Sequence, residues 1–324
     1  WCWQNLISRR VVWPSGRAKI VVPVESGGNT LYALVKINGQ DVGYFGIDTG
    51  ATRTCIDSQL ASQLRIKARS KARAEFPGYE HETECFRATI DELSIGDFTM
   101  GHLRALFVDF DFIQGRGVKF GILGSDLLSR CPFTLDYRNR TLTFYNPANF
   151  EPSKFAQSEK IFFFDRSPHI LLEVPGRQAA ANRSWWRSQK QDCLLVDTGA
   201  DFTRLDYPKG EVDMATVLSQ IKVLGFHLRE YSIRTVVSKK FENVTGILGG
   251  NVLKDYRLTF DYAGRQLWVE QYPLGFWEEL QSKGFDVRKR DLEGWTLLGI
   301  AVIDGRLDMA KELLNAQADI NAPN

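Results

Sequence analysis

The sequence has few cysteines and no CxxC pair, which argues against stabilisation by disulfide bonds and against a structural zinc site. The five cysteines lie far apart and are odd in number, so neither a disulfide framework nor a structural zinc site is indicated. His81 and Cys85 have a usable ligand spacing, but no second pair complements them. We therefore expect no metal and no other cofactor.

The chain also lacks a charge imbalance and a long apolar run. It has 41 Lys and Arg against 39 Asp and Glu, so its charge gives no reason to expect nucleic acid or an anionic membrane as a partner. The basic segment 65–73 alternates with apolar and small residues, and we interpret it as a solvated face. No stretch approaches 18 consecutive apolar residues, so no transmembrane helix is expected.

Several motifs are missing as well. There is no Gly-x-Ser-x-Gly elbow of a serine hydrolase, and neither a GxGxxG nor a GK[ST] loop for nucleotide phosphates. The chain begins with Trp1 rather than Met, so a preceding signal peptide is conceivable. The location in the cell stays open, with the cytoplasm slightly favoured.

What the sequence does contain is an internal repeat. Residues 121–145 and 246–270 align without a gap at an offset of 125, with identities that include a shared Gly-Ile-Leu-Gly. Each copy is preceded by one Asp-Thr-Gly-Ala, at 48–51 and at 197–200. With 324 residues and 44% hydrophobic content, the chain is long enough for two or three domains with a sizeable core. Two copies of one structural unit are therefore predicted.

The segments around these motifs have strand patterns. Residues 31–37 alternate and end at Asn38-Gly39, a dipeptide typical of tight hairpin turns. Short apolar runs at 44–47 and 193–196 lead directly into the two Asp-Thr-Gly segments, as buried strands would. Residues 133–135 and 142–144 flank another hairpin-like turn. The fold is therefore predicted to be mostly β.

Two kinds of short helix are also predicted. Residues 57–64 favour a helix capped by Asp57 or Ser58. The segment from 124 to 128 favours a second one capped by Ser125 or Asp126, with Gly250 and Asn251 as its counterparts in the second copy.

The paired Asp-Thr-Gly-Ala segments indicate acid-base chemistry. Peptide hydrolysis without a metal or a covalent nucleophile needs one group to activate water and one to protonate the substrate. Two adjacent carboxyl groups supply both. Two negative charges so close together are unfavourable, so the pair keeps one shared proton and has one acidic and one basic member. The predicted catalytic pair is Asp48 and Asp197. The threonines can hydrogen-bond across the loops, the glycines permit close approach and a positive φ, and the alanines keep the next position small: Thr49, Gly50, Ala51, Thr198, Gly199 and Ala200.

These motifs resemble those of the retropepsin-like aspartic proteases, in which apolar-apolar-Asp-Thr-Gly-Ala is followed later by apolar-Leu-Gly-x-(Asp/Asn)-Leu-Leu. The matching segments are 46–51 with 122–128, and 195–200 with 247–253. The resemblance covers roughly residues 30 to 272. Ser125 and Gly250 stand where viral-type members often carry Arg.

The resemblance implies a fold of two β-barrel lobes with a peptide or protein substrate bound between them. Family members with one copy form homodimers, so two copies in one chain imply a monomeric pseudo-dimer. The resemblance also implies a flap over the substrate. We expect it at 76–80, with Gly78 and Tyr79 as substrate-binding residues. In the second copy, Gly225 has the right spacing without an obvious hairpin. The loop 176–191 is expected to pack between the lobes or to line the cleft.

The C-terminal segment has a different, helical pattern. Gly294-x-Thr296-x-Leu298 and a 33-residue spacing between matching segments at 280–287 and 313–320 resemble an ankyrin repeat. Gln317 stands where a left-handed Gly is usual. One complete repeat with half of another cannot bury a solenoid core alone, so either more repeats follow or the unit docks on the protease. The resemblance implies a protein partner.

The sequence thus predicts three parts: lobes at 18–150 and 151–273 and a partial ankyrin module at 274–324. The predicted function is that of an aspartic endopeptidase. One alternative is a catalytically weak protease fold that binds peptides together with the ankyrin module. Another is a dimer in which lobes of different chains pair.

Overall fold

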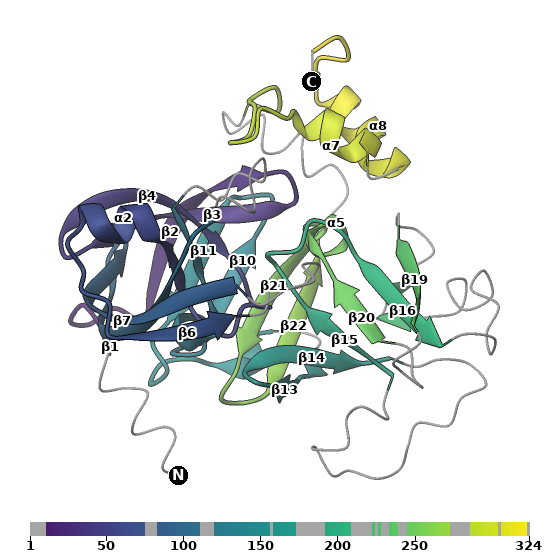
Figure 1. Ribbon diagram of the computed structural model, residues 1–324. Helices are drawn as coiled ribbons and strands as arrows, with labels where there is room; N and C mark the ends of the chain where they lie inside the picture. Colours follow the sequence, from purple (N-terminus) through teal and green to yellow (C-terminus); the bar gives the residue numbers. More distant parts are fainter. Residues whose placement is uncertain are drawn as a thin grey trace.

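The structure is a computed structural model that describes residues 11–74, 83–110, 120–155, 158–172, 192–208, 222–223, 226–227, 233–238, 245–272, 286–303 and 306–322. Two β-rich bodies lie side by side, and the C-terminal helices lie above them (Figure 1). We call the part built from β1–β11 the first lobe, the part from β12–β22 the second lobe, and residues 286–303 and 306–322 the C-terminal module. The predicted mostly β, two-lobed fold with a small helical module is confirmed.

The first lobe contains eleven of the described strands and two short helices. They are β1 (Val11–Val12), β2 (Lys19–Gly27), β3 (Thr30–Ile37), β4 (Gln40–Ile47), β5 (Cys55–Asp57), α2 (Ser58–Gln63), β6 (Ser70–Ala74), β7 (Thr83–Ile95), β8 (Phe98–Val108), β9 (Gly121–Leu123), α3 (Ser125–Leu128), β10 (Phe133–Asp136) and β11 (Thr141–Tyr145).

The second lobe repeats part of this order with shorter strands. It contains η2 (Pro152–Lys154), β12 (Ser158–Lys160), β13 (Phe162–Phe164), β14 (Ser167–Leu171), β15 (Cys193–Val196), β16 (Arg204–Pro208), β17 (Lys222–Val223), β18 (Phe226–His227), β19 (Arg234–Ser238), β20 (Thr245–Leu248), α5 (Gly250–Leu253), β21 (Tyr256–Asp261) and β22 (Gln266–Gln271).

The predicted strands that lead to the two Asp residues are confirmed. β3 and β4 form a hairpin through Asn38 (φ 50°) and Gly39 (φ 77°), and two positive φ angles are what a tight primed turn requires. β15 has the predicted bounds, Cys193–Val196. Most side chains of these strands are buried, because both faces of the strands that carry the loops are covered. The apolar runs thus fold as interior strands.

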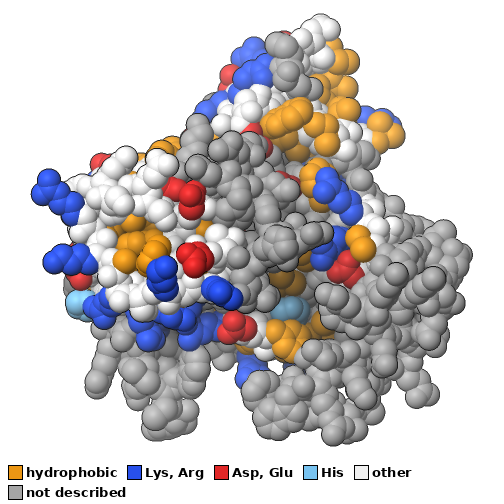
Figure 2. Space-filling view, in the orientation of Figure 1, with side chains coloured by type: hydrophobic (Ala, Val, Ile, Leu, Met, Phe, Trp, Pro, Cys, Tyr) orange, Lys and Arg blue, Asp and Glu red, His pale blue; other side chains and the backbone are white. Residues whose placement is uncertain are grey.

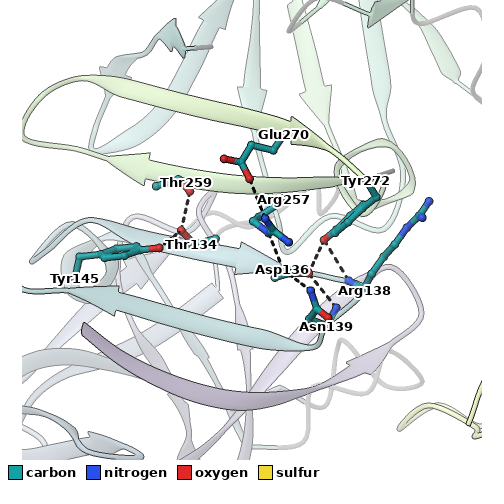
Figure 3. A network of polar contacts seen from close by, with 9 residues as sticks. All are labelled: Thr134, Asp136, Arg138, Asn139, Tyr145, Arg257, Thr259, Glu270 and Tyr272. Carbon is teal, nitrogen blue, oxygen red and sulfur yellow. Dashed lines mark hydrogen bonds and ion pairs between the residues drawn. The ribbon is translucent and has the colours of Figure 1, made fainter. Parts of the chain in front are cut away.

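The two copies of the repeat meet in one sheet. A 14-stranded sheet runs from β12, β22 and β21 of the second lobe directly into β10 and β11 of the first. Thr134 pairs with Thr259, its counterpart at the offset of 125, and their hydroxyl oxygens lie 2.7 Å apart (Figure 3). The stacked rings of Phe133 and Phe260 lie beside this pair, with centroids 4.9 Å apart. This continuous sheet joins the lobes around a pseudo-twofold axis.

An acidic side chain at the end of β10 gathers further contacts at this junction (Figure 3). Asp136 accepts hydrogen bonds from Arg257 Nε at 2.7 Å, Tyr272 Oη at 2.8 Å and Asn139 Nδ2 at 2.8 Å. These donors hold the pKa of the Asp136 carboxyl below its ordinary value although burial opposes them. Asp136 therefore ties the last strand of the second lobe to the first lobe.

The predicted short helices form, but the predicted caps of α3 and α5 are wrong. Asp57 caps α2 by accepting hydrogen bonds from Gln59 N and Leu60 N, as expected. The cap of α3 is Gly124, and neither Ser125 nor Asp126.

In the second lobe the cap of α5 is likewise Gly249, rather than Gly250 or Asn251. The reason is that the polar side chains at these helix starts bind other backbone and side-chain groups: Asp126 accepts from Thr54, and Asn251 accepts from Thr203.

The C-terminal module consists of α7 (Leu297–Ile303) and α8 (Leu307–Asn315) around a small apolar core. Gln317 adopts a left-handed conformation with φ 61°, so this position keeps the backbone of an ankyrin repeat without the usual Gly. Hydrophobic side chains gather on the outside of the module (Figure 2), among them Val302, Leu307 and Ile320. None of the helices in the described part of the chain has the length and hydropathy of a membrane-spanning segment.

Candidate active site

The two Asp-Thr-Gly-Ala loops meet at the centre of the molecule. β4 pairs in parallel with β9, and Asp48 N donates to Leu123 O at 3.1 Å. In the second lobe, β15 pairs in parallel with β20, and Asp197 N donates to Leu248 O at 3.0 Å. Each Asp therefore leaves its strand at the same point of an equivalent pair of strands. The second loop therefore occupies the position in its lobe that is equivalent to that of the first loop.

The threonines form a reciprocal set of hydrogen bonds across the two lobes. Thr49 N donates to Thr198 Oγ1, and Thr198 N donates to Thr49 Oγ1, each at 3.1 Å. Each hydroxyl also donates to a carbonyl of the opposite lobe: Thr49 Oγ1 to Val196 O at 2.6 Å, and Thr198 Oγ1 to Ile47 O at 2.7 Å. Both threonines are fully buried. These four hydrogen bonds hold the two loops in register.

The glycines provide room for the carboxylates. A Cβ on Gly50 would lie 2.5 Å from Asp197 Oδ2, and a Cβ on Gly199 would lie 2.5 Å from Asp48 Oδ2. Both distances are far below van der Waals contact. Each carboxylate thus lies against the backbone of the opposite loop, and any larger residue would push it away. Close approach, one of the two predicted reasons for these glycines, is found here, whereas neither Gly50 nor Gly199 has the positive φ that was also predicted.

The two carboxyl groups lie within hydrogen-bonding distance of each other. Each also accepts from its own loop: Ala51 N donates to Asp48 Oδ1 at 2.8 Å, and Gly199 N donates to Asp197 Oδ1 at 2.9 Å. Burial raises the pKa of Asp48, and its hydrogen bonds from Ala51 and Asp197 partly offset that rise. Burial and the nearby charge of Asp48 raise the pKa of Asp197 well above its ordinary value. The two carboxyl groups therefore form one coupled pair whose pKa values are both raised.

A second layer of support was not predicted from the sequence. Asp126 Oδ1 accepts hydrogen bonds from both N and Oγ1 of Thr54, each at 2.8 Å. In the second lobe, Asn251 Oδ1 accepts from Thr203 N at 2.7 Å and from Thr203 Oγ1 at 2.9 Å. In the sequence, a Thr six residues after each Asp was the one sign of this contact. Its role can be recognised only once its partner, the later Asp126 or Asn251, is known.

The positions that often carry Arg in viral-type enzymes have other contacts here. Ser125 Oγ donates to Thr49 O at 3.0 Å, directly behind the first loop. Gly250 lies against Asn29 of the first lobe, where a Cβ would come 2.9 Å from the Asn29 Cβ. Lys254 Nζ donates to Asn29 Oδ1 at 2.7 Å. The hairpin of Asn29 occupies the space that a large side chain at 250 would need.

One more hydroxyl group, from the second lobe, contacts the first Asp-Thr-Gly-Ala loop. Ser167 Oγ, at the start of β14, donates to Gly50 O at 2.8 Å. The expected flap residues Gly78 and Tyr79 lie outside the described residues, as do Gly225 and the loop 176–191.

Parts of the chain are similar to known proteins. Residues 33–127 match the family model described as aspartyl protease, and residues 293–322 match the model described as ankyrin repeat. A crystal structure of a retropepsin-like aspartic protease from Rickettsia conorii is similar at 18% identity and a TM-score of 0.30, covering 39% of this chain and 89% of that one. No curated protein matches the chain.

The two family models match separate parts of the chain. The predicted resemblance to aspartic proteases and to ankyrin repeats is confirmed by the two family models. The first match ends at residue 127, so it includes the first Asp-Thr-Gly-Ala and the segment 122–127 but not the second set. The second loop is identified by the internal repeat and by its contacts with the first.

Proposed function

We propose that the chain is an aspartic endopeptidase that hydrolyses peptide bonds with a water molecule activated between Asp48 and Asp197. The observation that carries the proposal is the reciprocal contact of the two loops, in which each carboxyl group lies against the glycine of the other loop. A peptide bond is attacked efficiently when one group removes a proton from water while another protonates the carbonyl oxygen. Two buried carboxyl groups that share one proton meet both needs.

The pKa of both carboxyl groups is raised by burial, which favours one proton shared between them. As part of the proposal we place that proton on Asp197. Asp48 accepts backbone hydrogen bonds that stabilise its anion. In this proposal Asp48 is the base that deprotonates water, and Asp197 is the acid that protonates the substrate carbonyl. When the tetrahedral intermediate collapses, Asp48 passes the proton that it took from water to the leaving nitrogen, the C–N bond breaks, and a hydroxyl of the intermediate returns its proton to Asp197.

The proposal includes the organisation of the chain. We assign residues 18–150 and 151–273 to the two lobes and 274–324 to the ankyrin module, with one active site per chain. The small residues at 49–51 and 198–200 hold the catalytic pair, and Gly78 and Tyr79 are proposed to contact substrate. The ankyrin match and the exposed apolar side chains of the module support a protein partner.

The test is digestion of a peptide library by wild type beside Asp48→Asn and Asp197→Asn, from acid to neutral pH. Both variants should lose cleavage by at least about a thousandfold, because neither a base nor a shared proton remains. Asp41→Asn is the matched control, since Asp41 is exposed and lies in a surface ion pair with Lys36. Variants that cleave like Asp41→Asn would refute the mechanism.

A peptide-binding scaffold is the second candidate, supported by the ankyrin match. It predicts that wild type binds library peptides without cutting them and that Asp48→Asn leaves binding unchanged. Sedimentation of the active material separates a monomer with one site from a dimer in which lobes of two chains pair.

A further inference from the structure

The C-terminal module is attached to both lobes at the same end of the molecule (Figure 1). On the second lobe, Arg306 forms an ion pair with Asp255, just after α5. Tyr272 belongs to the apolar core of the module while its hydroxyl donates to Asp136. Arg138 contributes a further ion pair, with Glu312 at 3.8 Å. The module thus packs on the interlobe junction drawn in Figure 3.

On the first lobe, the module contacts the turn between β2 and β3. Gly28 N donates to Asp291 Oδ2 at 2.7 Å, and Leu292 N donates to Ser26 O at 2.8 Å. Lys289 Nζ lies 3.1 Å from Glu25 Oε1. Asp291 also holds its own loop together, because its Oδ1 accepts from Glu293 N at 2.9 Å and from Trp295 N at 2.8 Å.

The other side of this turn holds the second catalytic loop. Asn29 Nδ2 donates to Asp201 O at 2.9 Å, and Asp201 follows directly after Ala200. Lys254 Nζ donates to Asn29 Oδ1 at 2.7 Å. Asn29 is buried. Gly28 and Asn29, adjacent residues of the turn, therefore connect Asp291 on one side with the loop that carries Asp197 on the other.

The equivalent turn of the second lobe differs. Tyr32 pairs with Gly46 and His169 pairs with Leu195, each opposite the residue two before a catalytic Asp. The turn of the second lobe is therefore 165–166, and both of its residues are exposed, whereas Asn29 is buried. The module covers one of two related turns, so it affects the two catalytic loops unequally.

We propose that Asp291 is a positioning residue of the active site: by fixing the turn at Gly28 and Asn29, the ankyrin module holds the second catalytic loop in register. The inference rests on the proposed peptidase function. In this inference the module contributes to catalysis by positioning the second loop, in addition to any role in binding a partner. A partner that pulls residues 291–295 away from the turn would lower the catalytic rate.

The test uses Asp291→Asn in the full chain. The amide oxygen of Asn can keep the two hydrogen bonds within residues 291–295. Its amide nitrogen is a donor, like Gly28 N, so the hydrogen bond to Gly28 is lost. Asp286→Asn is the matched control, because Asp286 is exposed and, within the described part of the chain, its side chain accepts hydrogen bonds from Arg288 alone. Asp291→Ala removes all three hydrogen bonds and should act in the same direction more strongly.

Three readouts are expected to move together in Asp291→Asn. The kcat should fall about tenfold with KM changed less than about twofold, the size that loss of one charge-assisted hydrogen bond gives. The upper limb of the pH profile should shift to lower pH, because carboxyl groups further apart raise each other's pKa less. Amide hydrogen exchange at residues 199–203 should quicken about fivefold or more relative to β7.

Each alternative result is decisive. If Asp291→Asn matches Asp286→Asn in kcat and in exchange, the positioning role is wrong while the proposed function stands. If exchange rises evenly through the chain, Asp291 serves stability alone and the inference is also overturned. If wild type cleaves no library peptide, the proposed function fails, and the exchange at residues 199–203 still decides whether the module holds the loop.

Discussion

Replacing Thr198 with Val tests whether the threonine contacts, rather than general packing, hold the lobes together. Val has nearly the same volume, so the change removes a hydroxyl and leaves no large cavity. Two buried groups lose their partner: Ile47 O, which accepts from Thr198 Oγ1 at 2.7 Å, and Thr49 N, which donates to it at 3.1 Å. Each buried unsatisfied group costs about 1–3 kcal/mol. Thr198→Val should therefore lower the free energy of unfolding by about 2–5 kcal/mol.

The matched variant is Thr198→Ser, which keeps the hydroxyl and loses one methyl group. Its cost should be about 1 kcal/mol, the value for one buried methylene. Urea unfolding of the three proteins gives the free energies, and cleavage by the folded fraction gives kcat. If Thr198→Val unfolds within about 0.5 kcal/mol of Thr198→Ser, well inside the margin expected for one hydrogen bond, the reciprocal hydrogen bonds do not stabilise the lobe contact and the reasoning is refuted.

Two further predictions follow from the carboxylate pair. Gly199→Ala should reduce kcat at least about a hundredfold with the fold intact, because its Cβ would lie 2.5 Å from Asp48 Oδ2 and a small displacement of a catalytic group is costly; steady-state kinetics of a variant with wild-type circular dichroism checks this. The raised pKa of Asp197 should make cleavage fall as pH rises through it. Since the folded pKa exceeds the unfolded one, the free energy of unfolding should fall as pH rises from about 4, the unfolded pKa of an aspartate, to the raised folded pKa, and Asp197→Asn should remove that part of the pH dependence in denaturation curves.

The strands and loops of the site could be predicted because their signals are local. β15 has the bounds that its apolar run indicates, and the Asn38-Gly39 turn adopts the two positive φ angles that its residues favour. The meeting of the two loops followed from the repeat, since equivalent segments in a duplicated fold reach equivalent places. Pattern and duplication were sufficient for this part.

The wrong helix caps show where local reasoning ends. Asp126 at the start of a helix is a good cap by composition, yet its carboxylate binds Thr54, which lies 72 residues earlier. The sequence did not indicate the role of the turn at Asn29, because that role depends on contacts with Asp201 and Asp291, both far away in the sequence. Contacts of this kind are chosen by the assembled fold, and a single sequence carries no period or spacing that marks them.

Duplication within one chain also explains why the two halves of the site differ. In a homodimer every residue at the interface appears twice, so a side chain that suits one side must suit the other. Here Ser125 binds the first loop while its counterpart Gly250 leaves room for Asn29. That space is what allows the turn of the first lobe to lie between the second loop and Asp291. The asymmetry is therefore the structural condition for attaching a third module to one side of a pseudo-symmetric active site.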